Sequence, residues 1–203
     1  MKTIGPRFAL NGTIGIASIP QKGVWKHLNS PSQQRGFSLV ELLVVIAIIL
    51  ILAAIAIPNL LRSRMSANGA SAAASLRQIS TANAIYSTVY SVGYAGTLAQ
   101  LGPVGAGCLS VGSNCADLID AAISGVSPAT PTPIKSGYIF TYYSPAVAPT
   151  PTSPNSSFAL VGAPTAFNST GTTSFCMDHS RDLREDPNGA ITTAVAAGCV
   201  GWP

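Results

Sequence analysis

Charged side chains are scarce in this sequence, and those present are unevenly placed. Only 9 % of the 203 residues are Asp, Glu, Lys or Arg. Residues 1 to 36 contain five basic residues and no acid, whereas the rest of the chain contains six basic and seven acidic residues. A nucleic-acid binder keeps a basic surface on its folded part. We therefore expect no nucleic-acid binding, and the basic N-terminal stretch indicates instead the cytoplasmic flank of a membrane segment.

Histidines and closely spaced cysteines are also lacking. Only His179 lies beyond residue 36, and the four cysteines do not form the closely spaced pairs that zinc sites use. Asp178, His179 and Ser180 are adjacent, so their side chains point in different directions and cannot align as orienting acid, base and nucleophile. The sequence contains no G-x-S-x-G pattern. We therefore expect no enzymatic activity.

One long apolar run dominates what is present. Positions 42 to 57 are sixteen consecutive apolar residues, and the wider segment 37 to 57 would form a helix of about 32 Å. That length matches the hydrocarbon core of a bilayer, which is about 30 Å thick. Glu41 lies near the start of this segment. A charged carboxylate is costly to bury in a membrane, so we expect it to pair with a group of opposite charge. The sequence thus predicts a membrane segment that contains one acidic residue, and a simple membrane anchor would not require that residue.

The region after the apolar run predicts the second half of a long helix. Pro58 interrupts the pattern and is expected to kink or loosen a helix. Beyond it, a stripe of apolar residues recurs mostly at steps of three, four or seven, which predicts one helix over residues 37 to 90, apolar all round at first and amphipathic afterwards. The stripe consists of Leu61, Met65, Ala72, Leu76, Ile79, Tyr86 and Tyr90.

The remaining sequence predicts a small sheet. A Pro/Thr-rich linker follows a short apolar piece at 116 to 123. Short runs of aromatic and β-branched residues then predict strands at 137 to 143, 157 to 163 and 173 to 178, with a weaker one near residue 183. We therefore expect an α+β fold in which a long N-terminal spine helix packs on a small antiparallel sheet.

The stretch "RGFSLVELLVVIAIILILAAIAIP", residues 35 to 58, resembles the start of type IV pilins and of the related pseudopilins of type II secretion. The pattern is a glycine, an aromatic residue, a short small or apolar stretch, a glutamate and an uninterrupted apolar helix. The resemblance covers about residues 35 to 65. It implies a pilin-like fold with a prepilin leader at 1–36, a transmembrane and assembly half of the helix at 37–58, and a globular head at 59–203.

The resemblance also implies roles for single residues. Prepilin peptidase would cleave after Gly36 and methylate the new amine of Phe37. Glu41 would pair with the N-terminal amine of a neighbouring subunit, which selects one register because either charge is costly to bury alone. Pro58 matches a proline around which pilin helices can lose helicity in the filament, and Asn59 and Gly69 would make such local melting easier.

The function that the resemblance implies is that of a structural subunit of a type IV pilus, without a cofactor. The chain would begin as a single-pass precursor in the bacterial cytoplasmic membrane and end in an extracellular or periplasmic helical filament of its own copies. Prepilin peptidase and an inner-membrane assembly platform would be further partners. Two alternatives stay open: a type II secretion pseudopilin, and a Sec-exported periplasmic domain whose mature chain would begin near Ile57.

The cysteines and a late acidic cluster complete the candidate sites. All four cysteines follow the apolar run, where export allows disulfides. Three connectivities are possible, and the preferred one pairs sequence neighbours, Cys108 with Cys115 and Cys176 with Cys199. The later pair resembles the stapled loop near the C-terminus of many pilins. The acids after Cys176 could bind calcium, as in some major pseudopilins, although a solvated polar turn is the favoured interpretation. These acids are Asp178, Asp182, Glu185 and Asp186.

Overall fold

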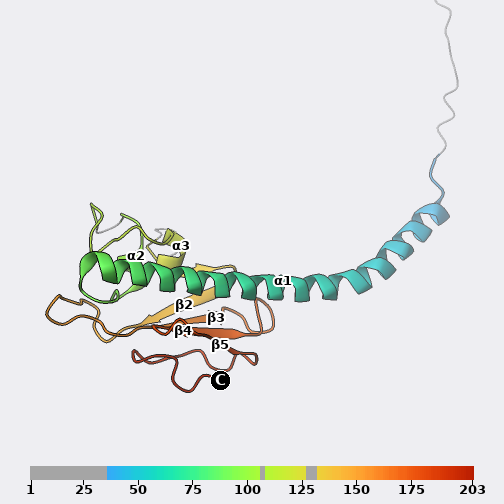
Figure 1. Cartoon of the computed structure of the whole chain (residues 1–203). Coiled ribbons are helices and arrows are strands. Elements are labelled where there is room, and N and C mark those ends of the chain that lie inside the picture. The colour runs from blue at the N-terminus through green and yellow to red at the C-terminus, as the bar shows by residue number, and fades with distance from the viewer. Residues whose placement is uncertain (1–35, 106–107, 127–131) are drawn as a thin grey trace, which may run out of the picture. The chain divides into compact units, whose positions relative to one another are not determined.

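The computed structural model describes residues 36–105, 108–126 and 132–203, so the expected leader, except Gly36, lies outside the described residues. It confirms an α+β fold with one long N-terminal helix and an antiparallel sheet (Figure 1). The helices are α1 (Leu39–Tyr90), α2 (Leu98–Leu101) and α3 (Ala121–Ser124). The strands are β1 (Ile134–Lys135), β2 (Tyr138–Tyr143), β3 (Ala159–Pro164), β4 (Ser174–Asp178) and β5 (Leu183–Asp186).

The sheet is a meander in which each strand pairs with the next one along the chain. The β1–β2 hairpin is closed by Ser136 and Gly137, with φ of 51° and 72°. Positive φ at both positions is what a two-residue type I′ turn requires, and its twist suits paired strands. Sequence patterns predicted β2 to β5 but not the two-residue strand β1, α2 or α3.

Alternation along the strands gives the sheet two buried faces. One face packs on α1 and α2, and it contributes side chains such as Phe140, Leu160 and Met177 to the main core. The opposite face is covered by residues 187 to 203, which we call the C-terminal segment, and forms a smaller core around Val161 (Figure 1). Covering both faces explains why the central strand β3 is buried at five of its six positions.

Only the second half of α1 belongs to the core. Its buried residues begin at Gly69, and residues 58 to 68, which we call the neck, are exposed or partly exposed. Leu61 is 55 % exposed, so the predicted apolar stripe joins the core later than its sequence pattern begins. The first hydrogen bond from α1 to the rest of the head joins Asn68 Nδ2 to the carbonyl of Thr170 at 2.9 Å.

Candidate functional site

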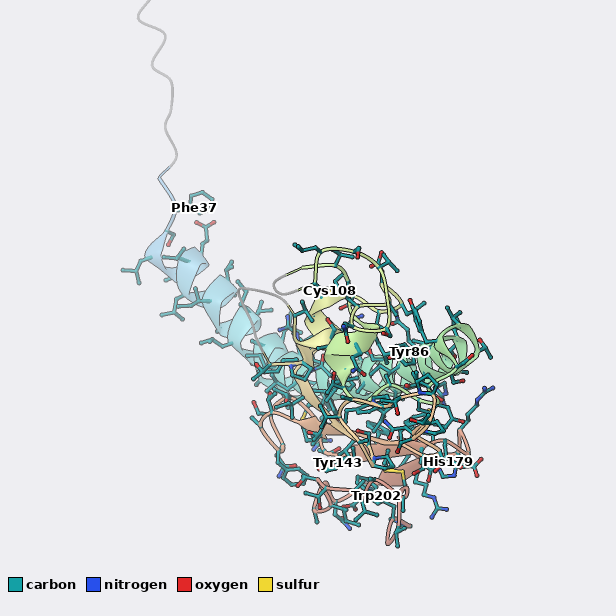
Figure 2. The ribbon with its side chains drawn as sticks, turned by 90° about the vertical axis from the view of Figure 1, so that its left-hand side faces the viewer. Phe37, Tyr86, Cys108, Tyr143, His179 and Trp202 are labelled. Carbon is teal, nitrogen blue, oxygen red and sulfur yellow. A yellow bond between two sulfur atoms is a disulfide. The ribbon has the colours of Figure 1, made fainter. Side chains whose placement is uncertain are left out.

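The bond after Gly36 is open to an enzyme in this structure. A Cβ added at Gly36 would meet no atom of the described residues within 4 Å. Phe37 is 90 % exposed and precedes the first turn of α1 (Figure 2). An exposed, non-helical peptide bond is what a peptidase needs, because the backbone must enter its active site.

Glu41 closes the N-terminus of α1 through a capping box. The Ser38 N–H donates to Glu41 Oε2 at 2.9 Å, and the Val40 N–H donates to Ser38 Oγ at 3.3 Å. These bonds satisfy two amides that would otherwise lack partners at the start of the helix. The negative charge also lies at the positive end of the helix dipole. Glu41 therefore has a local structural role in a single chain.

Sequence reasoning missed the role of Ser38, although the signal was present. Ser-Leu-Val-Glu at 38 to 41 is the S-x-x-E pattern of a capping box directly before an apolar run. Of the two carboxylate oxygens of Glu41, Oε2 accepts a hydrogen bond from the described residues and Oε1 accepts none. The second carboxylate oxygen can therefore take a cation without loss of the cap.

The apolar residues 42 to 57, which we call the stem, are not covered by any other part of the chain that the structure describes. Their large side chains are 49 % to 66 % exposed. Burial of one such side chain is worth about 1.5–3 kcal/mol, so this surface favours lipid or other apolar helices over water. Among the described residues, α1 is the one helix long and apolar enough to cross a membrane.

Pro58 lies inside α1 and does not end it. Proline has no amide hydrogen, so the carbonyl of Ala54, four residues earlier, loses its usual helical donor. The helix nevertheless continues through Asn59 into the neck. A backbone bond is therefore already missing at the boundary between stem and neck, where local unwinding would break fewer bonds than elsewhere.

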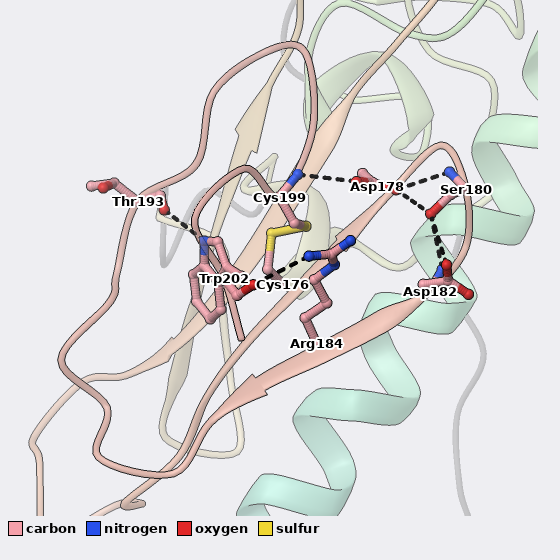
Figure 3. Close-up of a disulfide and its surroundings, with 8 residues drawn as sticks. All are labelled: Cys176, Asp178, Ser180, Asp182, Arg184, Thr193, Cys199 and Trp202. Atoms are coloured by element: carbon pink, nitrogen blue, oxygen red, sulfur yellow. Dashed lines mark hydrogen bonds between the residues drawn. A yellow bond between two sulfur atoms is a disulfide. The ribbon is translucent and has the colours of Figure 1, made fainter.

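The structure pairs the cysteines as sequence neighbours, with Cα–Cα distances of 6.3 Å for Cys108–Cys115 and 5.9 Å for Cys176–Cys199. The second disulfide fastens the C-terminal segment to β4 (Figure 3). Two further bonds close this segment: Trp202 Nε1 donates to the carbonyl of Thr193 at 3.0 Å, and Arg184 Nη1 donates to the carbonyl of Trp202 at 3.2 Å.

Two of the four calcium candidates bind backbone amides instead. Asp178 Oδ2 accepts from the Cys199 N–H at 3.0 Å, and Asp186 Oδ2 accepts from the Ile191 N–H at 2.8 Å. Burial favours a higher pKa for Asp178, but hydrogen bonds from Cys199 and Ser180 outweigh it and hold the pKa below its ordinary value. The bond from Ile191 likewise lowers the pKa of Asp186.

The other two candidates, Asp182 and Glu185, are exposed. Across the described ranges, no three His, Cys, Asp or Glu side chains gather as a metal site would require. Asp178 and Asp186 thus anchor the C-terminal segment. The favoured interpretation as a polar turn, with calcium binding as the alternative, stays a prediction.

Comparisons with known proteins concern the N-terminal segment. Residues 31–57 match the family described as "Prokaryotic N-terminal methylation motif". Over 34 residues the chain is 68 % identical to the "Type IV wide pilus major component PilA4" of Thermus thermophilus. This match covers 17 % of the present chain and 26 % of the relative, so it spans about a quarter of the relative's length. No solved structure matched the chain.

Proposed function

We propose, from the type IV pilin family to which the N-terminal segment of this chain belongs, that the chain is a structural subunit of a type IV pilus. The observation that carries the proposal is the methylation segment followed by a stem whose large side chains are 49 % to 66 % exposed. The stem contributes no buried side chain to the core of the head, so the head does not need the stem for its own packing. The stem would therefore lie in lipid in the precursor and pack against the stems of other copies in the filament.

Processing would turn the precursor into a subunit able to assemble. Prepilin peptidase would cleave after Gly36 and methylate the amine of Phe37, which stays cationic. The precursor would span the bacterial cytoplasmic membrane through residues 37 to 57, whose helix from Leu39 onward is long and apolar enough to do so. An inner-membrane assembly platform would then move the subunit from lipid into an extracellular or periplasmic filament.

Glu41 would select the register between subunits. Two opposite charges about 4 Å apart attract by about 4 kcal/mol at an effective dielectric constant near 20. The same charges are costly when buried alone, so a neighbour displaced by one helical turn would be rejected. The capping box supports this role because it orients the carboxylate at the end of the helix, next to the new N-terminus.

The test of processing is the intact mass and N-terminal sequence of the protein taken from its native membrane. We expect a chain that begins at Phe37 and carries one added methyl group. A mature chain that begins near Ile57 would instead support the Sec-exported alternative and overturn the proposal.

The test of assembly is electron microscopy of cells that make the processed protein. Long surface filaments that disappear when the gene is deleted are expected for a pilus. Filaments confined to the periplasm, together with a loss of protein secretion on deletion, would instead identify a type II secretion pseudopilin.

A further inference from the structure

Two arginines of the neck have no charged partner among the described residues. Arg62 and Arg64 are exposed, and residues 42 to 90 contain no acid. Glu185 lines the same open groove as Arg62, but within the described ranges neither arginine forms an ion pair. Both guanidinium groups are therefore free to bind a group of opposite charge.

The distribution of charge around the stem shows that these arginines do not orient it. Basic residues normally gather on the cytoplasmic flank of a membrane helix. Residues 1 to 36, which precede the stem, contain five of them. The neck follows the stem and would lie on the exported flank, where basic residues are usually few. Arg62 and Arg64 therefore need an explanation other than membrane orientation.

The position of the two arginines along α1 supplies that explanation. Arg62 is five positions and Arg64 seven positions after Ile57, or about 8 and 11 Å along the helix. The headgroup layer beyond the hydrocarbon core is about 5–8 Å thick. Side chains of a helix lean toward its N-terminus, here toward the lipid, and long basic side chains extend to the interface. Both guanidinium groups can therefore reach the level of the lipid phosphates.

The two side chains leave the helix on opposite sides. Positions 62 and 64 are about 200° apart around α1, because each residue turns the helix by about 100°. A protein partner on one side of the neck would contact one arginine and miss the other. Lipid surrounds a membrane helix, so phosphate groups lie on every side of it at this level. Since a guanidinium group binds a phosphate through two parallel hydrogen bonds, the arrangement favours lipid headgroups over a protein partner.

We infer that Arg62 and Arg64 bind phosphate groups of anionic phospholipids on the exported side of the membrane and so fix the depth of the stem. The inference rests on the proposed function, because it concerns the membrane-bound precursor. A deeper helix would carry two charges into hydrocarbon, which is costly. A shallower helix would expose apolar side chains of the stem to water. The arginines and the stem together therefore define one depth.

Solid-state NMR of the full chain in vesicles of phosphatidylglycerol and phosphatidylcholine tests these contacts directly. Lipid phosphorus dephases the signal of a guanidinium carbon only when the two nuclei are close together. The signal of one arginine is obtained as the difference between the parent chain and a variant that lacks it. The variants are Arg62→Gln, Arg64→Gln and, as the matched control, Arg77→Gln. Arg77 is exposed on the same helix but lies about 30 Å beyond Ile57.

We expect phosphorus to dephase the signals of Arg62 and Arg64 and to leave the signal of Arg77 unchanged. If neither neck arginine is dephased, or only one of them, the inference is wrong. Equal dephasing of Arg77 would also overturn it, because the contacts would then reflect adsorption of the head to the vesicle surface.

Lipid selectivity gives a second test. A tryptophan in place of Leu61, which is 55 % exposed, reports on the lipids around the neck, and its emission is taken by difference from the chain without it. Brominated phosphatidylglycerol should quench this emission more than brominated phosphatidylcholine. Arg62→Gln and Arg64→Gln should each lower that preference roughly fivefold, the attraction of one basic residue to an anionic surface. Arg77→Gln should leave the preference unchanged, and an unchanged preference in the double neck variant would refute the inference.

Extraction of native membranes with alkaline carbonate separates failure of this inference from failure of the proposed function. If the full chain resists extraction but its neck arginines are not close to phosphorus, the inference is wrong and the membrane stage of the proposed function remains. If alkaline carbonate removes the chain, the stem does not span the bilayer, and the proposed function fails together with the inference.

Discussion

The disulfide between Cys176 and Cys199 should carry more of the head's stability than the one between Cys108 and Cys115. The later pair is 23 residues apart in sequence and the earlier pair seven. By the loss of chain entropy in the unfolded state, closing these loops is worth about 3 and about 2 kcal/mol, respectively. The later bridge also joins β4 to the segment that covers the second sheet face. Replacing both of its cysteines by alanine should therefore lower the free energy of unfolding by about 3 kcal/mol or more.

Urea unfolding of the detergent-solubilised, processed chain measures this loss. Trp202 is the only tryptophan after residue 36 and is 4 % exposed, so its emission reports on the C-terminal segment directly. Both cysteines of the later pair are buried, and alanine leaves no polar group without a partner there. The matched control replaces Cys108 and Cys115 by alanine and should cost about 2 kcal/mol. The reasoning fails if the later pair costs less than this control.

Three further predictions concern α1 and the acids. Gly69→Ala should stabilise the head by about 1 kcal/mol, because alanine favours helix and the new Cβ would lie an ordinary 3.5 Å from Tyr138 Oη; a lower urea midpoint would contradict this. Asp178 and Asp186 have lowered pKa values in the fold, so they stabilise it at neutral pH. That stabilisation should fade as the pH falls through 3.8, the ordinary value, to the folded-state pKa values, and a melting temperature constant over this range would refute it. Ser38→Ala should lower the local stability of the first turn of α1 by about 1 kcal/mol and leave the free energy of global unfolding unchanged. Amide hydrogen exchange in micelles measures this local stability. Ser38→Thr keeps the hydroxyl and should leave the first turn intact.

The long helix and the central strands could be predicted because their patterns are local. Sixteen apolar residues in a row and the recurrence that follows them define α1 whatever the rest of the chain does. The strands carry aromatic and β-branched residues between clear turn residues. The sequence also predicted that the helix would continue through Pro58, and α1 does so, although proline removes one of its backbone hydrogen bonds.

The C-terminal segment could not be predicted, because its structure depends on partners distant in sequence. Residues 187 to 203 show no periodicity, and they are placed by the disulfide to β4, by the carboxylates of Asp178 and Asp186, and by burial of Trp202. The acids were interpreted as a polar turn or a cation site for the same reason. Which donors face a carboxylate is decided by the tertiary fold.

Gly69 illustrates a partial prediction. The sequence identified it as a weak point of the helix. The structure adds that Gly69 is buried beside Phe175 and Tyr138 of the sheet. A flexible residue sits where the helix first meets the sheet. No single-sequence pattern distinguishes such a site from an isolated glycine in solvent.

The neck has a consequence for the distance between head and lipid. Ile57 ends the apolar run and Gly69 is the first buried residue of α1, twelve positions or about 18 Å of helix later. The headgroup layer on one side of a bilayer is about 5–8 Å thick. In the membrane-bound precursor that we propose, an upright helix would hold the core of the head about 10 Å clear of the headgroups. The neck then acts as a spacer between the core of the head and the lipid, so the helix can be extracted from lipid without that core entering the headgroup layer.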